Sequence, residues 1–385
     1  MKEDMKYLYW LNSVEGIGFK AMMVLKKYVG SGSDIYHTPE HDLRWFLNER
    51  QLTALVNRRK EWDVDGEFEK LKQEKIAFYP YGSPGYPEKL LSLPSPPAAL
   101  YLKGSFPDAN TPAVALIGTR KCSGYGSAMA KQLGALLAER GIVVVSGMAR
   151  GIDGIGQRAV CGAGGATYAV LGCGVDVVYP PENRQLYEQI ERQGEQGGII
   201  SEYQPGTPPN AGQFPARNRI ISGLSDAVVV IEAKEKSGTM ITVDMALEQG
   251  REVYAMPGRL VDGLSCGCNR LIKQGAGMII SIEEFVDEIL QASKLRLANE
   301  IKELKKKAPP APKATTKEEK LILNFTAEEK QVFSCLDYAP RSLEQISAMN
   351  PQISYESLLR ILVTFCLRGF AKQMGAGSYY KSDDI

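Results

Sequence analysis

The sequence predicts an α/β fold in which helices cover both faces of a mostly parallel sheet. Two apolar runs rich in β-branched residues, 113–117 and 142–145, have the length and composition of buried central strands. Between them, residues 125–140 carry apolar side chains at helical spacing, and Gly141 provides a stop. A strand, a helix and a second strand in this order join by a right-handed crossover, which is the repeating unit of a parallel sheet.

Further apolar runs extend this sheet. We expect additional strands at 167–171, 198–202, 227–231 and 251–256, and additional helices from Asn183, from Pro215 and at 240–249. The stretch 79–104 is rich in proline, which excludes a helix, although 99–103 fits a short strand at the edge of the sheet. We interpret this stretch as a structured clamp between domains.

Glycine-rich turns with hydroxyl or basic side chains follow several of these strands, at 118–120, 146–153 and 237–239. The carboxyl ends of parallel strands meet at one edge of a sheet, where ligands bind in such folds. Glycine lets the backbone approach a phosphate, a following helix offers free N–H groups, and arginine adds a bidentate donor. Arg217 and Arg219 in the first turn of the helix from Pro215 oppose the helix dipole, which implies a compensating anion. The sequence therefore predicts an anion-binding rim.

The residues themselves give no support for catalysis. Neither a P-loop nor a G-x-G-x-x-G fingerprint is present, and the main domain contains no histidine for a Ser-His-Asp arrangement. Asp153, Glu202 and Glu232 could act as acids or bases, but their spacing pairs none of them. We expect no catalytic residue and no cofactor.

Composition limits the partners and the compartment. The 385 residues are enough for two or three domains, and a net charge of +1 means that nucleic-acid binding would have to come from a local patch. Seven cysteines without a C-x-x-C pair suggest neither a disulfide framework nor a zinc site, and His37 and His41 lack a third ligand. The N-terminus is charged and no run reaches membrane-helix length, so we expect a cytoplasmic protein without membrane contact.

The segments that flank the main domain, 71–290, differ from it in composition. Residues 1–70 read as a small helical domain, in which 11–18 followed by a helix at 20–28 resembles a helix-hairpin-helix motif. Its glycine N–H groups could contact a phosphate, or the motif could serve packing alone. Residues 291–320 become polar and rich in lysine and proline, which is typical of a flexible linker.

The tail, 321–385, returns to an ordered pattern. A capping box at Thr326 opens one helix, two more are expected at 342–349 and 354–368, and 370–381 fits a hairpin. Three helices and a hairpin resemble a winged-helix module. The tail holds six Lys plus Arg and seven Asp plus Glu, a balance that disfavours duplex binding, so we expect a partner-binding or auxiliary role.

Taken together, these motifs resemble the DprA/Smf family of bacterial DNA-processing proteins. The blocks that carry the resemblance fall in one order over about residues 80 to 280, and they are 86–90, 113–120, 145–153, 172–183, 200–203, 214–221, 230–239 and 267–276. The flanking helical domain and the tail are also similar to those of the family, although they are less diagnostic.

The resemblance implies an extended Rossmann-like sheet that binds single-stranded DNA. It also implies protection of incoming DNA, help in loading the RecA recombinase during natural transformation of competent cells, and a homodimer formed through the main domain. The implied DNA-binding residues are Gly118, Thr119, Arg120, Ser146, Gly147, Arg150, Arg217, Asn218, Arg219, Ser237 and Gly238. One departure is Gly156-Gln157, where family members commonly have Ala-His.

Two alternatives remain at this stage. Tyr125, Tyr203 and Phe214 could stack on bases or could serve packing. A nucleotide hydrolase of a related Rossmann-like branch is the alternative function, because Glu232 precedes a Ser-Gly-Thr turn ending at Thr239, although the full Pro-Gly-Gly-x-Gly-Thr pattern is missing.

Overall fold

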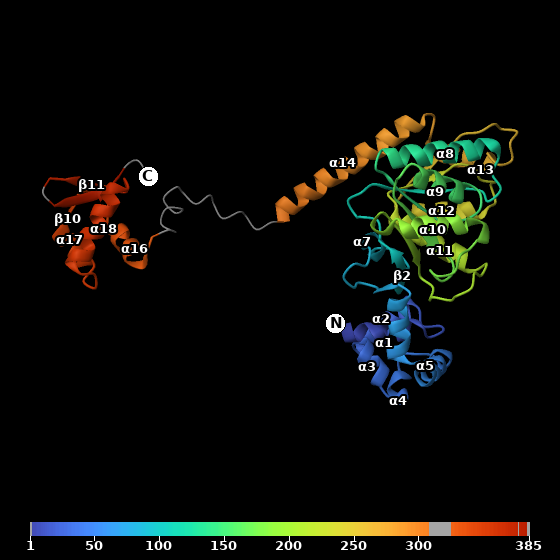
Figure 1. Cartoon of the computed structure of the whole chain (residues 1–385), viewed down its shortest axis with the longest axis horizontal. Coiled ribbons are helices and arrows are strands. Elements are labelled where there is room, and N and C mark those ends of the chain that lie inside the picture. The colour runs from blue at the N-terminus through green and yellow to red at the C-terminus, as the bar shows by residue number, and fades with distance from the viewer. Residues whose placement is uncertain (1, 308–324, 376, 383–385) are drawn as a thin grey trace. The chain divides into compact units, whose positions relative to one another are not determined.

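The computed structural model describes residues 2–307, 325–375 and 377–382. The chain forms two compact units, Met1–Asn299 and Glu300–Ile385. Figure 1 shows the elements of each unit. Among the described residues, no helix is both long enough and apolar enough to span a membrane.

The first unit is built on a nine-stranded sheet with the order β1-β2-β6-β5-β4-β3-β7-β8-β9. The strands are β1 (Ala77–Pro80), β2 (Ala99–Gly104), β3 (Ala113–Ile117), β4 (Val143–Ser146), β5 (Thr167–Leu171), β6 (Gly197–Ser201), β7 (Ala227–Val230), β8 (Glu252–Ala255) and β9 (Gly277–Met278). Within this sheet, the described pairs β1 with β2 and β2 with β6 are antiparallel, and the other pairs are parallel. The mostly parallel α/β sheet expected from the sequence is confirmed.

Two expectations about the proline-rich stretch were wrong. β2 lies between β1 and β6 rather than at the edge, because the short strand β1 adds outside it and ends at Pro80. A four-residue helix, α7 (Glu88–Leu91), forms within the stretch. Pro87 occupies its N-cap, a position at which the missing proline N–H breaks no helical hydrogen bond.

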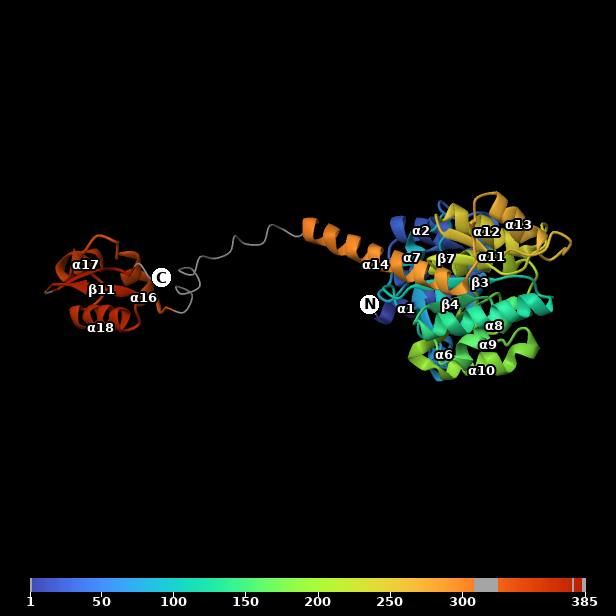
Figure 2. The ribbon, with the colours of Figure 1, turned by 90° about the horizontal axis from the view of Figure 1, so that it is seen from above.

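Helices cover both faces of the sheet, as Figure 2 shows in a view along its layers. The helices of the main domain after α7 are α8 (Gly124–Glu139), α9 (Ile152–Gly162), α10 (Arg184–Arg192), α11 (Gln213–Leu224), α12 (Gly238–Glu248), α13 (Cys266–Lys273) and α14 (Ile282–Lys307), with short 3₁₀ turns at Pro181–Asn183 and Gly194–Gln196. Apolar residues of α7, α11, α12 and α13 share one core with the sheet, and those of α8, α9 and α14 share another.

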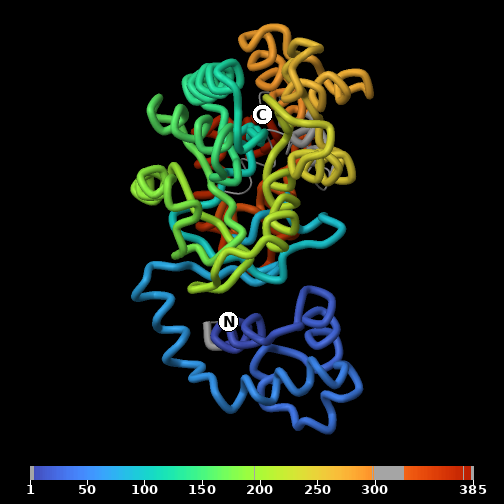
Figure 3. Tube along the Cα trace, turned by 90° about the vertical axis from the view of Figure 1, so that its right-hand side faces the viewer, coloured from blue at the N-terminus to red at the C-terminus, as the bar shows by residue number. Residues whose placement is uncertain are grey.

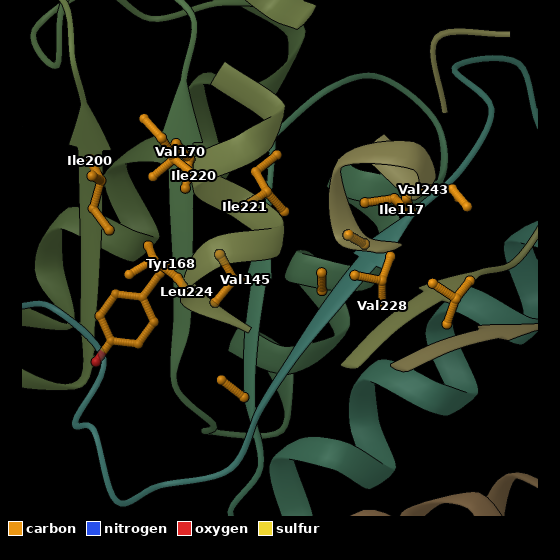
Figure 4. Packing of buried hydrophobic residues seen from close by; sticks show 14 of the residues in the cluster. Ile117, Val145, Tyr168, Val170, Ile200, Ile220, Ile221, Leu224, Val228 and Val243 are labelled. Carbon is orange, nitrogen blue, oxygen red and sulfur yellow. The ribbon is translucent and has the colours of Figure 1, made fainter. Parts of the chain in front are cut away.

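Successive side chains of the central strands point alternately into the two cores. On β3, Ala115 and Ile117 face the first core, whereas Val114 and Leu116 face the second, because successive side chains of a strand point to opposite faces. Figure 4 shows how residues of α11, among them Ile220, pack over the strands in the first core.

The N-terminal helices form a lobe with its own core around buried Trp10 (Figure 3). They are α1 (Lys2–Asn12), α2 (Phe19–Tyr28), α3 (Gly32–His37), α4 (Glu40–Leu43), α5 (Glu49–Glu61) and α6 (Val64–Gln73). Tyr9 of α1 joins this lobe to the sheet, since its ring lies 5.4 Å from that of Phe78 on β1 and 6.0 Å from that of Tyr101 on β2. Lobe and sheet belong to one compact unit, so a domain boundary near residue 70 stays a prediction.

Part of the segment 291–320, which was expected to be a flexible linker, is helical. Residues 291–307 continue helix α14, because the segment is rich in lysine, leucine, alanine and glutamate, which are good helix formers. Residues 308–320 lie outside the described residues.

The second unit has its own core around Phe365. Its elements after residue 324 are α16 (Ala327–Ser334), β10 (Arg341–Ser342), α17 (Leu343–Met349), α18 (Tyr355–Leu367), β11 (Ala371–Met374) and β12 (Ser378–Lys381). The strands form a sheet of order β10-β12-β11. The expected helices and hairpin are present, and the winged-helix assignment stays a prediction.

Candidate nucleic-acid interface

Three glycine-rich turns meet beyond the carboxyl ends of β3, β4 and β7. The N–H of Ile152, at the start of α9, donates to the carbonyl of Thr119 (3.2 Å), and the N–H of Thr119 donates to the carbonyl of Glu232 (2.8 Å). Gly151 permits the first contact, because its φ is +72° and a Cβ there would lie 2.3 Å from the Thr119 oxygen. The turns therefore form one continuous surface.

This surface encloses a cleft of about 600 Å³. The expected DNA-binding residues that line it are Gly118, Thr119, Arg120, Arg217, Asn218, Ser237 and Gly238. A smaller adjoining pocket shares Arg120 and Arg217 with the cleft and adds Gly147 and Arg150. Most of the rim expected from the sequence is thus brought together by the fold.

Arg120 is the exposed cation of the cleft. Its guanidinium lies over the ring of Phe214 on α11, with Cζ 5.5 Å from the ring centroid. The ring of Tyr179 stacks on the same Phe214 ring, with the two centroids 5.4 Å apart and an angle of 28° between the ring planes. Within the described part of the chain Arg120 forms no ion pair, so its charge is available to an anion.

The N-terminus of α12 opens into the same cleft without a capping side chain. Ser237 is the N-cap residue, its side chain makes no capping bond, and no acidic residue occupies the first turn. Among the described residues, the buried Ser237 Oγ has no hydrogen-bond partner, and Thr239 and Thr242 line the cleft beside it. A helix N-terminus with free N–H groups and a positive dipole end is suited to a phosphate.

Unlike the N-terminus of α12, the N-terminus of α8 is capped by side chains. The expectation that the helix after β3 offers free N–H groups was therefore wrong. The carboxylate of Glu232 accepts from the Ser123 N–H at 2.9 Å and from the Ser123 hydroxyl at 2.5 Å. Glu232 is only 2% exposed. This carboxylate therefore already occupies the position that an anion would take at α8.

Arg217 forms the floor of the cleft rather than a free cation. It is 4% exposed and its Nη1 donates to the carbonyls of Gly147 (2.9 Å) and Val170. Glycine at position 147 leaves room for this guanidinium, because a Cβ there would lie 2.6 Å from its nitrogens. Burial lowers the pKa of Arg217 to about 10, although the nearby carboxylate of Asp153 opposes the shift.

Asp153 is buried on the same floor. Its carboxylate accepts from the Gly147 N–H at 3.1 Å. Burial raises the pKa of Asp153, while the charge of Arg217 and the Gly147 hydrogen bond oppose that rise. The third carboxylate considered as an acid or base, Glu202, is bonded to Arg219. Asp153, Glu202 and Glu232 are therefore all engaged within the fold.

Arg150 lies at the outer margin of the smaller pocket and is paired. Its Nε and Nη2 donate to Oε1 of Glu182 at 3.1 and 2.7 Å. The hydrogen bond from Arg150 holds the pKa of the Glu182 carboxyl below its ordinary value. Both side chains are about half exposed, so an incoming anion competes with Glu182 for this arginine.

The structure places two expected residues away from the cleft. Arg219 bonds the Glu202 carboxylate at 2.7 and 2.8 Å and the Ser95 carbonyl at 2.7 Å. Side chains two residues apart on a helix differ in direction by about 200° around the helix axis, so Arg217 and Arg219 lie on opposite sides of α11. Ser146 is fully buried and donates to the carbonyl of Leu116 at 2.6 Å. We leave Arg219 and Ser146 out of the binding surface.

Two buried amide side chains hold the turn that carries Arg150. Gln157 accepts from the Met148 N–H at 3.1 Å and donates to Thr167 Oγ1 and the Tyr168 carbonyl at 3.1 and 3.2 Å. Asn183 donates to the Met148 carbonyl at 2.8 Å. Met148 has a positive φ of 51°, which these bonds keep in place. Gln157 is therefore structural here.

Sequence reasoning missed Tyr179 and Thr242 as lining residues, and it included Thr239 only as the end of the turn 237–239. Tyr179 was visible only as part of a Tyr-Pro-Pro-Glu-Asn block that starts a helix, and the two threonines lie on α12 at positions three apart, which face one side of a helix.

The chain matches the family model of DNA recombination-mediator protein A over residues 77–290. It is 42% identical over 203 residues to the DNA processing protein DprA of Streptococcus pneumoniae, covering 53% of this chain and 71% of that protein. It is 39% identical over 239 residues to Protein Smf of Synechocystis sp., covering 61% of this chain and 59% of that protein.

A solved structure agrees with these sequence matches. The X-ray structure of DNA processing protein A from Streptococcus pneumoniae aligns with 74% of this chain and 97% of its own, at 35% identity and a TM-score of 0.64. The resemblance expected from the motifs is confirmed, and because the family model matches more than half of the sequence, the chain belongs to the DNA recombination-mediator protein A family.

Proposed function

We propose that this protein binds single-stranded DNA in the cleft beyond β3, β4 and β7. The observation that supports this most directly is the exposed, unpaired Arg120 beside the uncapped N-terminus of α12. Together they offer a full positive charge, backbone N–H groups and hydroxyls to a phosphate.

The aromatic pair favours an unpaired strand over a duplex. Tyr179 and Phe214 stack beside Arg120 in the smaller pocket. In a duplex the faces of the bases are covered by their neighbours, whereas an unpaired strand can stack on aromatic rings without regard to sequence. The net charge of +1 also disfavours a broad electrostatic attraction to duplex DNA.

The decisive experiment is the salt dependence of binding for Arg120→Ala. Loss of one phosphate contact weakens binding to any unpaired sequence and lowers the slope of log affinity against log salt by about 0.7. Arg192→Ala, an exposed arginine on α10 that lines neither pocket, is the matched control. Wild-type affinity and slope in Arg120→Ala would reject the cleft as the binding site.

We propose a mediator role rather than catalysis. The family description names a recombination mediator, so protection of incoming DNA and loading of RecA in natural transformation are the expected consequences of strand binding. The experiment that tests this role measures the rate of RecA filament formation on single strands covered by single-strand-binding protein. Addition of this protein accelerates filament formation, and Arg120→Ala does not.

A nucleotide hydrolase would need a free acid near the phosphate site. Glu232, the residue that suggested this alternative, is bonded to Ser123 and buried. Incubation of the protein with nucleoside monophosphates is therefore expected to release no free base, and release would favour the enzyme.

Homodimer formation through the main domain is part of the same proposal. Among the described residues, the edge strand β9 pairs with β8 alone, and Met278 and Ile280 beside this edge are 51% and 73% exposed. An apolar edge with unpaired backbone groups is suited to a second copy. Met278→Lys is expected to shift the protein toward monomers in sedimentation, and an unchanged mass would exclude this edge.

A further inference from the structure

One helix of the second unit presents apolar side chains to solvent at regular spacing. On α18, Tyr355, Leu359, Val363 and Leu367 are 56%, 40%, 46% and 84% exposed. They repeat every four residues, so they form one continuous ridge along the helix. The adjacent side of α18 faces the core of the unit, and Leu358, Leu362 and Phe365 are fully buried there.

This ridge is not suited to a DNA groove. α18 follows α17 after a short turn, which is the position of a recognition helix in helix-turn-helix modules. Such a helix reads DNA with basic and amide side chains, yet α18 offers Arg360 as its only base and carries Glu356. Residues 321–385 hold fewer basic than acidic side chains, so phosphate contacts would gain little there.

We infer that α18 binds α18 of a second copy of this chain, antiparallel and about a two-fold axis. Ridges of side chains on one helix pack into grooves of another, and a crossing angle of about 20°, as in antiparallel helix bundles, keeps the whole length of the ridge in contact. In the two-fold arrangement Tyr355 meets the partner's Leu367, and Leu359 meets the partner's Val363. Every exposed apolar side chain of the ridge is covered by another one.

The charges at the ends of the helix select the antiparallel arrangement. Exposed Glu356 lies in the first turn of α18, and exposed Arg368 is its C-cap. Within the described residues neither side chain forms an ion pair. Antiparallel pairing brings Glu356 of each copy near Arg368 of the other, whereas parallel pairing would place like charges together. The helix dipoles also oppose each other favourably.

Sedimentation of the full chain over a range of concentrations tests this interface. In a chain that also carries Met278→Lys, so that β9 contributes no dimer, replacing Leu359 and Val363 by glutamate together is expected to convert dimers into monomers. Leu247→Glu, which changes a 59% exposed leucine on α12, is the matched control and leaves the mass unchanged. Wild-type mass in the double variant would overturn the inference.

A charge reversal provides a second test that does not depend on burying a charge. Glu356→Arg and Arg368→Glu are each expected to weaken association at least twofold, because each places like charges side by side. The combination of both restores association to the wild-type level. Failure of the combined variant to recover, with unchanged helix content by circular dichroism, would overturn the antiparallel pairing.

Discussion

The guanidinium of Arg120 lies over the ring of Phe214, so the exposed cation of the cleft is held by an aromatic side chain from a different element. Arg120 follows β3, whereas Phe214 belongs to the first turn of α11. The contact orients the guanidinium without neutralising it, because a ring attracts a cation but carries no net charge. A carboxylate in the same place would have competed with phosphate.

Phe214→Leu is expected to weaken binding of unpaired DNA. The leucine keeps apolar packing but removes the stacking surface and the support for Arg120, and base stacking on an aromatic ring contributes about 1–3 kcal/mol. Fluorescence anisotropy with a labelled single strand measures the change. Tyr125→Leu is the control, because the Tyr125 hydroxyl bonds the Pro257 carbonyl outside the cleft. Equal affinity of both variants would show that Phe214 serves packing alone.

Glu182→Gln is expected to tighten DNA binding. The substitution removes the charge that pairs with Arg150 at 2.7 Å, which leaves the arginine free at the margin of the smaller pocket. The affinity for single strands rises at low salt, and the salt slope steepens by up to about 0.7 because one more cation meets phosphate. Glu188→Gln, which frees Arg192 on α10, leaves both quantities unchanged. Unaltered binding in Glu182→Gln would exclude Arg150 from the interface.

Local sequence predicted most of the sheet because its central strands are short, uninterrupted apolar runs. β3 and β7 were recognisable for this reason, and both are fully buried. The edge strands were not predicted, since β9 has only two residues and β1 ends in proline. Such strands form because a neighbouring strand provides partners for their backbone groups, which no local pattern reveals.

The turns of the candidate site could be predicted from the sequence. Which of its charged side chains are paired within the fold could not. Glu232 caps α8 by bonding Ser123, which is 109 positions away, and residue spacing contains no sign of that pairing. Arg217 and Arg219 were read as one basic group, although helix geometry directs them to opposite sides. Arg217 lines the cleft and Arg219 bonds Glu202. Contacts with residues far along the chain therefore engage both arginines, Arg217 in the floor of the cleft and Arg219 outside it.

Gln157→Leu is expected to lower the free energy of unfolding by about 1–3 kcal/mol. A leucine of similar size leaves the buried Met148 N–H without an acceptor and Thr167 without its amide donor, and unmade hydrogen bonds of buried groups are costly. Urea denaturation measures the change. Gln274→Leu, at the exposed end of α13, is the control. A difference below about 0.5 kcal/mol between the variants would contradict the structural role of Gln157.

Asp226→Asn is expected to destabilise the first unit by about 3 kcal/mol at neutral pH. Asp226 bonds Lys89 at 2.7 Å, the Ala113 N–H at 2.9 Å and Arg296 of α14, and it is largely buried. Burial alone would raise the pKa of Asp226, but Lys89 and the other donors outweigh it and hold the pKa below its ordinary value.

The pH dependence of this variant gives the sharper test. Because the folded-state pKa of Asp226 is lowered, the ionised carboxylate stabilises the fold above the unfolded pKa of about 3.9, and this contribution is lost as the pH falls through the folded value. The difference in unfolding free energy between wild type and Asp226→Asn therefore has its largest value at pH 7 and becomes smaller below about pH 4. Asp262→Asn, which breaks the exposed pair with Arg259, changes stability by less than about 1 kcal/mol at neutral pH. A difference for Asp226→Asn that stayed constant from pH 7 to pH 3 would mean that packing, and not the charge on Asp226, anchors α14 to the sheet.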